Sequence, residues 1–349
     1  MTTTSTAPAA ASATIASPVR IGIIGGGGIA GAHLNGYKAA GDAVRITAIA
    51  DAFEDTLAKR VEETGAKGYA DFAELVKDPE VDAVDICLPH HLHRDAIVAA
   101  AEAGKHILCE KPLCLTPEEA RDVRDAVQKA GVTLMCAHNQ LFMPAVAKAK
   151  EIIDSGALGT VYEVRTTDSF YNNFDPANMG WRAKAATSGG GEYIDTGYHP
   201  TYLLMHLSGG GRPEKVFSMM STHRLDFMEG EDSAQVLVRF DNGSVGQLVT
   251  SWAYQAAPGT DRFSVVGEKG SLSSDGTTLR VKLHAEDTEQ VFEHEEVDTF
   301  AAEIADFLEC LTTGKRPLNT EDEGIAVLGI ILAAYESART GTLADVPEV

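Results

Sequence analysis

The sequence predicts an α/β protein with two unlike halves: an N-terminal doubly wound parallel sheet, then an α+β domain with an open, mainly antiparallel sheet. From Val19 to about Ala137, β-rich runs alternate with helical stretches, as in a parallel sheet covered by helices. Beyond Asn139, strands follow one another and helices return near the end. A chain of 349 residues is long enough for two cores. We expect domains over residues 18–138 and 139–349, after a disordered tail over residues 1–17.

The composition indicates a reduced protein without nucleic-acid or membrane partners. Its formal net charge of −22 opposes binding to nucleic acid and to anionic membranes. The five cysteines form no Cys-x-x-Cys pair, which argues against a disulfide framework or a zinc site. No apolar run approaches the roughly 20 residues of a membrane span, and the tail lacks the Lys or Arg of a targeting signal. We expect a cytoplasmic protein.

The N-terminal half predicts repeated strand–helix units. Strands rich in Val, Ile and Leu are expected at Val19–Ile24, Arg45–Ala50, Ala83–Leu88, His106–Cys109 and Val132–Ala137. Helices are expected at Ile29–Ala40, Phe53–Thr64, Phe72–Lys77, Asp95–Ala103 and Pro117–Lys129. Ligands of a doubly wound sheet bind outside the carboxyl ends of its strands, so the residues that follow each strand are the candidates for a site.

A glycine-rich turn follows the first strand. Gly25, Gly27 and Ala30 match the G-x-G-x-x-G/A spacing of a dinucleotide-binding turn. The glycines of that motif allow a tight turn and the approach of a pyrophosphate, and the small third residue lets helix and strand pack closely. The following helix begins near Gly28 and Ile29, and it would offer N–H groups and its positive dipole end to the phosphates.

Asp51 ends the second strand, where a carboxylate would accept hydrogen bonds from the adenosine ribose of a dinucleotide. The alternative is a surface aspartate after a buried strand. Ala52 and Phe53 come next, so no adjacent Arg or Lys suits a 2′-phosphate. The sequence therefore favours NAD over NADP, with Ala52 beside the cofactor.

The C-terminal half predicts a meander of strands with helices before and after it. Asp241-Asn242-Gly243 is a hairpin turn signal between two of the strands. Strands are expected at Thr160–Thr167, Lys215–His223, Ser233–Phe240, Ser244–Trp252, Arg262–Val266 and Thr278–His284. Helices are expected at Ala145–Ser155, Phe300–Thr312 and Glu321–Arg339.

Two strand ends of the N-terminal half carry groups suited to a site. The first strand end runs into Pro89-His90-His91-Leu92-His93. A metal site is one interpretation of these histidines, but no carboxylate or cysteine stands at a matching spacing. We interpret this segment as a cofactor-contact turn, with His93 as an alternative helix cap. The second strand end carries Glu110-Lys111-Pro112. The Lys111 ammonium would orient a substrate oxygen or relay a proton, and the alternative is a charged pair that closes a strand.

A glycine run leads into a third candidate group, in which Asp195 and His199 are four residues apart. On one helix they would share a face, and the carboxylate would raise the proton affinity of the imidazole and fix its tautomer. Such a histidine is suited to act as a general base. The alternative is a plain Asp–His pair on a helix surface.

Taken in order, the glycine turn, Asp51, Glu110-Lys111-Pro112 and Asp195…His199 resemble the glucose–fructose oxidoreductase / inositol dehydrogenase / rhizopine-catabolism (Gfo/Idh/MocA) family from about Val19 onward. The resemblance implies a Rossmann domain, a C-terminal sheet that forms a homodimer or homotetramer, and NAD(P)-linked oxidation of a sugar or polyol. It implies that Lys111, Asp195 and His199 are the catalytic residues. It also places around the cofactor Leu88, Pro89, His90, His93, Glu110, Lys111, Asn139, Trp181 and Arg182.

The chain departs from the family pattern on the substrate side. Gln140-Leu141-Phe142 follows Asn139 where many members carry an arginine before the Phe, and Tyr202 stands where an aspartate often follows the histidine. Ala30 also replaces the commoner third glycine. Candidate substrate contacts, placed by position alone, are Lys111, Asn139, Arg165, Asp168, Tyr171, Arg182, Asp195 and His199.

These expectations support an NAD-dependent dehydrogenase that reversibly oxidises a secondary hydroxyl of a sugar, glycoside or cyclitol, without a metal. His199 would remove the hydroxyl proton, Lys111 would stabilise the charge on the oxygen, and Asp195 would orient Lys111 or His199. A second hypothesis is an enzyme that retains and recycles NAD during elimination, hydrolysis or epimerisation of a sugar derivative. A third is a non-catalytic dinucleotide sensor.

Overall fold

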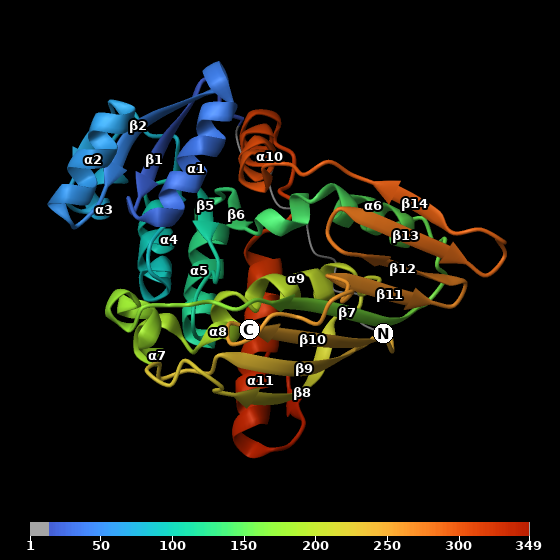
Figure 1. The fold of residues 1–349 in the computed structure, drawn as a ribbon. Helices are drawn as coiled ribbons and strands as arrows, with labels where there is room; N and C mark the ends of the chain where they lie inside the picture. Colours follow the sequence, from blue (N-terminus) through green and yellow to red (C-terminus); the bar gives the residue numbers. More distant parts are fainter. Residues whose placement is uncertain (1–13, 349) are drawn as a thin grey trace.

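The computed structural model describes residues 14–348, which form two sheets surrounded by helices (Figure 1). The predicted fold class is confirmed, because one sheet is wholly parallel and the other is mixed and mainly antiparallel. Most of the expected disordered tail, residues 1–13, lies outside the described part. Its last residues are placed, however: the Ile15 N–H donates to Leu311 O at 2.9 Å. The expectation of disorder is therefore wrong for residues 14–17.

The N-terminal sheet of the described chain contains six parallel strands in the order β3-β2-β1-β4-β5-β6. This is the order of a dinucleotide-binding sheet, in which the ligand crevice opens where the strand order reverses, here between β1 and β4. The prediction missed β3, a three-residue edge strand. The strands are β1 (Val19–Ile24), β2 (Val44–Ala50), β3 (Lys67–Tyr69), β4 (Ala83–Ile86), β5 (His106–Glu110) and β6 (Leu134–Ala137).

Helices connect these strands, and one of them is capped at both ends by its own sequence. Thr116 accepts the Glu119 N–H at the start of one helix, and Gly131, with φ +66°, ends it in the left-handed conformation. The helices are α1 (Gly28–Ala39), α2 (Glu54–Thr64), α3 (Phe72–Leu75), α4 (His93–Glu102) and α5 (Pro117–Ala130). Short 3₁₀ turns follow β4 and β6, η2 (His90–Leu92) and η3 (Asn139–Phe142).

The second sheet of the described chain has the order β14-β13-β12-β11-β7-β10-β9-β8-β15. The β7–β10 pair is parallel, and the other pairs are antiparallel. Three of its short strands, β12, β14 and β15, were not predicted. The strands are β7 (Val161–Ser169), β8 (Pro213–Ser221), β9 (Ser233–Phe240), β10 (Val245–Ser251), β11 (Phe263–Gly267), β12 (Gly270–Ser274), β13 (Thr278–Leu283), β14 (Gln290–Glu293) and β15 (Ala344–Asp345).

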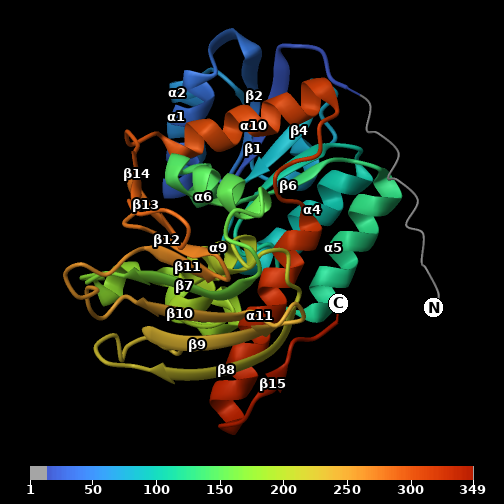
Figure 2. The ribbon, with the colours of Figure 1, turned by 90° about the vertical axis from the view of Figure 1, so that its right-hand side faces the viewer.

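Helices cover one face of this second sheet. Strand β9 alternates strictly, with Val236, Val238 and Phe240 buried and Leu237 exposed between them. On the covered side α9 packs on β7 and β10, and α11 packs on β8 and α5 (Figure 2). The helices of this half are α6 (Pro144–Asp154), α7 (Ala185–Ser188), α8 (Glu192–Asp195), α9 (Tyr198–His206), α10 (Thr299–Thr313) and α11 (Glu321–Thr340), with the 3₁₀ turn η5 (Gly180–Ala183).

One helix of the C-terminal half returns to the N-terminal sheet. Helix α10 lies against α1, where Ile304 and Phe307 share a buried core with Val19 and Leu34. The approach is close: a Cβ on Gly36 would lie 2.5 Å from Ile304 Cδ1. Residue 139 therefore does not divide the chain into separate packing units, because α10 completes the core of the first sheet.

Candidate active site

A cavity of about 220 Å³ opens where residues that follow β4, β5 and β6 meet the C-terminal half. Its lining includes two of the three predicted catalytic residues and several of the predicted cofactor contacts: Ile29, Leu88, His90, Glu110, Lys111, Asn139, Gln140, Trp181, Arg182, His199 and Phe300. A larger cavity of about 550 Å³ lies near the amino ends of β2 and β3 and contains none of the predicted catalytic or cofactor residues. We therefore assign the candidate site to the smaller cavity, at the carboxyl ends of the strands.

The Lys111 ammonium is held by Asp195. Lys111 Nζ donates to Asp195 Oδ1 at 2.8 Å and to its backbone oxygen at 2.9 Å, and both side chains are nearly buried. Arg182 Nε donates to the second carboxylate oxygen at 2.8 Å. Burial opposes the ionisation of Asp195, but Lys111 and the neighbouring positive groups outweigh it and hold its pKa far below the usual range. Asp195 is thus a carboxylate shared by two cations.

The predicted pairing of Asp195 with His199 is not found. A turn at Thr196–Gly197 separates α8 from α9, and the carboxylate of Asp195 faces Lys111 and Arg182. His199 Nδ1 is sealed from solvent without a hydrogen-bond partner in the described chain. Burial and the charge of Lys111 lower the pKa of His199 to about 3, the opposite of the rise expected from a carboxylate neighbour. His199 is therefore a neutral imidazole at ordinary pH, and a ligand hydroxyl would have to approach Nε2.

The glycine turn leaves open space beside the start of α1. Gly25 has φ +94°, and a Cβ there would lie 2.5 Å from Cys87 O, so the turn presses against the end of β4. At Gly27 and Gly28 a Cβ would meet nothing within 4 Å. The N–H groups of the first helical turn have no partners within the helix, so these open positions suit a phosphate. Ala30 is fully buried, as the close packing of helix and strand requires.

Asp51 holds the turn from the end of β2. Its Oδ2 accepts the Gly26 N–H at 2.7 Å, and its Oδ1 accepts the Phe53 N–H at 2.8 Å. The neighbouring Ala52 is exposed. The carboxylate therefore stands beside the glycine turn in a fixed orientation, where a ribose hydroxyl would approach.

Arg60 is a site residue that the sequence reasoning missed. From α2 its Nε donates to Gly26 O and its Nη2 to Gly27 O, both at 2.8 Å. Nη1 donates to Glu63 at 2.7 Å, and the residue is only 9% exposed. The guanidinium thus fixes two carbonyls of the glycine turn. No spacing rule signals such an arginine, because its partners are backbone atoms.

His90 belongs to the wall of the cavity. Its Nδ1 donates to Ser188 O at 2.8 Å, and burial lowers its pKa to about 3, so the ring is neutral. Trp181 packs against it edge to face with ring centroids 4.4 Å apart, and the Arg182 guanidinium lies 4.3 Å from the Trp181 ring centroid. The predicted Trp181-Arg182 pair is therefore brought to the cavity beside Asp195.

His93 lies behind the cavity rather than in its lining. Both ring nitrogens are within hydrogen-bond distance of backbone carbonyls, Pro112 O at 2.7 Å and Leu88 O at 2.8 Å. It is the first residue of α4 and is fully buried. His93 therefore links the turn after β4, which contains the half-buried Pro89, to the turn after β5.

On the presumed substrate side, polar residues from four segments meet. Asn139 Nδ2 donates to Thr299 Oγ1 at 2.9 Å. Asp168 accepts from Arg262 Nη2 at 3.2 Å and from Gln140 Nε2 at 3.4 Å. Arg262 was not predicted, and it places a guanidinium near a site whose sequence lacks the arginine that many family members carry after Asn139.

Two predicted substrate contacts, Arg165 and Tyr171, are neither in the cavity lining nor hydrogen-bonded to a lining residue in the described chain. Thr166 of β7 points to α9, where its hydroxyl donates to Pro200 O. The neighbouring Arg165 points to the opposite, open face, where it pairs with Glu163 and is exposed. Tyr171 is 58% exposed, with the Arg224 guanidinium 3.8 Å from its ring centroid. The alternation of side chains along a strand and the course of the following loop account for both differences.

Comparisons with known proteins agree with this arrangement. A model described as "Oxidoreductase family, NAD-binding Rossmann fold" (GFO_IDH_MocA) matches residues 19–138, and one for the "GFO/IDH/MocA C-terminal domain" matches residues 146–273. Myo-inositol 2-dehydrogenase of Thermotoga maritima is 30% identical over 91% of this chain and 96% of its own. Levoglucosan dehydrogenase of Pseudarthrobacter phenanthrenivorans is 30% identical over 73% of each chain.

Solved structures give the same result for the fold. A levoglucosan dehydrogenase in complex with NADH and levoglucosan superposes with a TM-score of 0.86 at 28% identity, covering 95% of this chain and 100% of the other. An aldose-aldose oxidoreductase from Caulobacter crescentus complexed with glycerol gives 0.83, also at 28% identity, covering 94% and 99%. Among residues 14–348 no helix is long and apolar enough to cross a membrane.

Proposed function

The chain belongs to the Gfo/Idh/MocA family of NAD-binding oxidoreductases, and we propose that it is an NAD-dependent dehydrogenase that oxidises a secondary hydroxyl of a sugar, glycoside or cyclitol. One observation carries the proposal: Lys111, fixed by Asp195, and the neutral His199 line the same cavity. The pair provides a cation for the reacting oxygen and an acceptor for its proton. Relatives that act on levoglucosan and on inositols support this substrate class.

The residues that would hold NAD fit that cofactor. Open positions at Gly27 and Gly28 leave room for the pyrophosphate, and the oriented carboxylate of Asp51 suits a ribose with a free 2′-hydroxyl. Arg60 is the nearest cation of α2, but two carbonyls and Glu63 engage its guanidinium, so it is not free for a 2′-phosphate. We therefore assign NAD rather than NADP. When bound, NAD⁺ supplies the acceptor for the hydride.

The proposed roles follow from hydrogen-bonding capacity. His199 has a lowered pKa, so its imidazole is unprotonated and Nε2 is able to accept the hydroxyl proton. Lys111 has its Nζ fixed by two acceptors on Asp195, and its remaining N–H donates to the same substrate oxygen as negative charge develops there. Asp195 orients Lys111 rather than His199. In the direction of ketone reduction the same groups return the proton.

The open face of the second sheet is proposed as the interface of a homodimer or homotetramer. Met219 on β8, Leu237 on β9 and Val245 on β10 are 66, 45 and 43% exposed, on three neighbouring strands. Exposed apolar side chains over several strands of one sheet face mark an interaction surface. The flat, symmetric partner that such a face fits is a second copy of itself.

A cytoplasmic location is proposed from the cysteines. All five, Cys87, Cys109, Cys114, Cys136 and Cys310, are buried and free in the structure. Unpaired cysteines are typical of proteins from a reducing compartment.

The test is a panel of sugars, glycosides, inositols and anhydrosugars, incubated with the purified full-length protein and NAD or NADP. We expect net NADH formation with at least one neutral polyol or sugar, and a preference for NAD. NAD that co-purifies with the protein, without net NADH formation on any substrate, would instead favour the hypothesis of a retained, recycled cofactor. No turnover with either cofactor, in either direction, would contradict the proposal.

A further inference from the structure

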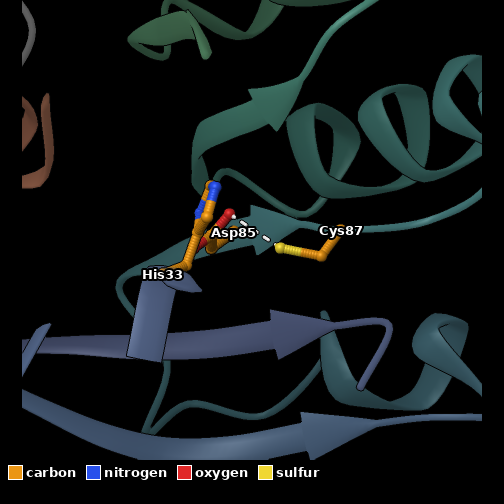
Figure 3. A group of neighbouring side chains, drawn as sticks. All are labelled: His33, Asp85 and Cys87. Atoms are coloured by element: carbon orange, nitrogen blue, oxygen red, sulfur yellow. Dashed lines mark hydrogen bonds and ion pairs between the residues drawn. The ribbon is translucent and has the colours of Figure 1, made fainter. Parts of the chain in front are cut away.

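A buried ionic network lies directly behind the cavity. His33 of α1 is fully buried beside Asp85 of β4 and Cys87, which follows that strand (Figure 3). Its Nδ1 lies 2.8 Å from Asp85 Oδ2, and its Nε2 lies 3.1 Å from Glu110 Oε1. Cys87 Sγ lies 3.5 Å from Asp85 Oδ1. One imidazole thus bridges two carboxylates from adjacent parallel strands.

His33, Asp85 and Cys87 have the side chains of a metal site, but their geometry is that of a proton-sharing network. Two ligands of a tetrahedral zinc ion, each about 2.0–2.1 Å from it, lie roughly 3.3 Å apart, whereas His33 and Asp85 approach to 2.8 Å. Both imidazole nitrogens face carboxylates, and only the imidazolium donates from both. Burial opposes that charge, but Asp85 outweighs it and raises the pKa of His33 well above its usual value.

The second partner of His33, Glu110, reaches the cavity. Its carboxylate lines the cavity at the end of β5, and the residue is 8% exposed. Oε1 accepts from His33, and Oε2 accepts the backbone N–H of Lys111 at 3.1 Å. Burial alone would raise the pKa of Glu110, but the hydrogen bond from His33 reverses the effect, and the pKa is lowered.

The same neighbourhood contains an internal comparison. Glu303 of α10 is also fully buried, but neither of its carboxylate oxygens has a hydrogen-bond partner in the described chain. Its pKa is raised well above the usual value by burial. Of two buried glutamates near one imidazole, the one hydrogen-bonded to His33 has a lowered pKa and the other has a raised pKa. The hydrogen bond to His33 is a contact that Glu110 makes and Glu303 lacks.

We propose that His33 is a positioning residue that keeps Glu110 ionised at the cavity wall, and that this charge makes the site favour NAD⁺ over NADH. The oxidised nicotinamide ring is a cation and the reduced ring is neutral, so a fixed carboxylate beside it stabilises the oxidised form selectively. The inference rests on the proposed function, because it assumes that the nicotinamide enters this cavity. It assigns Glu110 an electrostatic role distinct from the donor role of Lys111.

Dissociation constants of NAD⁺ and NADH test the proposal without any substrate. Each is measured on the full-length protein by calorimetry or nucleotide fluorescence, between pH 5.5 and 8.5. Glu110→Gln is expected to weaken NAD⁺ relative to NADH by about tenfold, the order expected for one nearby charge. Glu303→Gln is the matched control and is expected to leave the ratio unchanged, because burial raises the pKa of Glu303, which opposes a negative charge on that side chain.

The role of His33 is tested by His33→Gln and His33→Lys. In His33→Gln the ratio is expected to become pH-dependent, with NAD⁺ binding weakened at low pH and recovered as Glu110 ionises; the wild type stays flat. His33→Lys retains the charge and is expected to restore the wild-type ratio. Asp85 acts on Glu110 through His33. The titratable groups that interact with Glu110 directly, and whose titration must be followed beside it, are His33, Cys87, His93, Cys109, Lys111, Cys136, His199 and Glu303.

The outcomes separate this inference from the proposed function. If Glu110→Gln leaves the ratio of the NAD⁺ and NADH dissociation constants unchanged, the electrostatic role of Glu110 is overturned. This result does not depend on whether the His33 variants fold. Equal losses for NAD⁺ and NADH in His33→Gln, at every pH, overturn the positioning role and indicate a structural one. If neither nucleotide binds the wild-type protein, the proposed function itself fails.

Discussion

Replacing Lys111 by Met tests the proposed active site most directly, because one ammonium both pairs with Asp195 and lines the cavity. Breaking a buried ion pair costs about 3–5 kcal/mol when it leaves a charge without a partner. Here the carboxylate keeps a second partner, since Arg182 Nε lies 2.8 Å from its other oxygen. Met also retains most of the apolar stem of the lysine. We therefore expect Lys111→Met to cost only about 1–2 kcal/mol of unfolding free energy.

The shared carboxylate makes the two cations interdependent. Arg182→Met leaves the Lys111–Asp195 pair intact, and because the Arg182 side chain is 43% exposed, we expect a loss of no more than about 1 kcal/mol. The double variant leaves Asp195 without a cation, so its loss should exceed the sum of the single losses and reach about 3–5 kcal/mol. The coupling is measured by comparing the urea unfolding free energies of the wild type, the two single variants and the double variant.

The effect on catalysis should be much larger than the effect on stability. Loss of one preorganised donor to a developing oxyanion costs about 10²–10³ in kcat. We expect that loss for Lys111→Met and less than about tenfold for Arg182→Met, followed by NADH formation on the best substrate of the panel. Lys77→Met is the matched control, because Lys77 is 66% exposed and pairs with the exposed Glu74. A Lys111→Met enzyme that folds and keeps a kcat within a few-fold of wild type would refute the assigned role.

Three further predictions follow from other parts of the structure. Arg60→Met removes two charge-assisted bonds to the glycine turn, so the Kd for NAD measured by titration should rise about tenfold or more while kcat changes little; an unchanged Kd would contradict the role of Arg60. Burial lowers the pKa of His90 to about 3 and that of His206 to about 4, from 6.5. As the pH falls, the unfolded chain therefore takes up these protons at a higher pH than the folded state does. Stability should therefore be complete above about pH 6.5 and fall as the pH drops toward 4, and equal urea midpoints at roughly pH 7 and 4.5 would contradict this. Leu237→Arg on the open sheet face should lower the mass measured by light scattering to that of a monomer while the thermal unfolding of the protomer is retained.

The helices and strands that could be predicted from the sequence are those whose own side chains carry a clear apolar pattern. Strands β4 and β5 are buried on both faces and read as apolar runs, so their ends, and with them Glu110 and Lys111, were predictable. Strand β12 reads Gly-Ser-Leu-Ser-Ser and has only Leu272 to signal it. It is a strand because β11 and β13 bond to it on both sides, which is a property of its neighbours and not of its own sequence.

The site shows the same division between local and distant causes. Lys111 and His199 stand in sequence motifs and line the same cavity. The spacing of Asp195 and His199, however, says nothing about a lysine 84 residues earlier that competes for the carboxylate. Arg60 and Arg262 act through a backbone carbonyl and a distant aspartate, so no local pattern marks them. A local sequence pattern does not reveal contacts between charged groups that are far apart in the chain.

The charges around the cavity favour the proposed neutral, hydroxyl-rich substrate over a charged one. Lys111 and Arg182 are balanced by Asp195 and Glu110, and His199 stays neutral because burial and Lys111 lower its pKa. The site is thus close to electroneutral inside a protein of net charge −22. A phosphorylated or carboxylated sugar would bring an anion into the field of an acidic protein, at a site where Lys111 and Arg182 already share the carboxylate of Asp195. A polyol brings only hydroxyl groups, and these exchange hydrogen bonds with Lys111 and His199 without disturbing that balance.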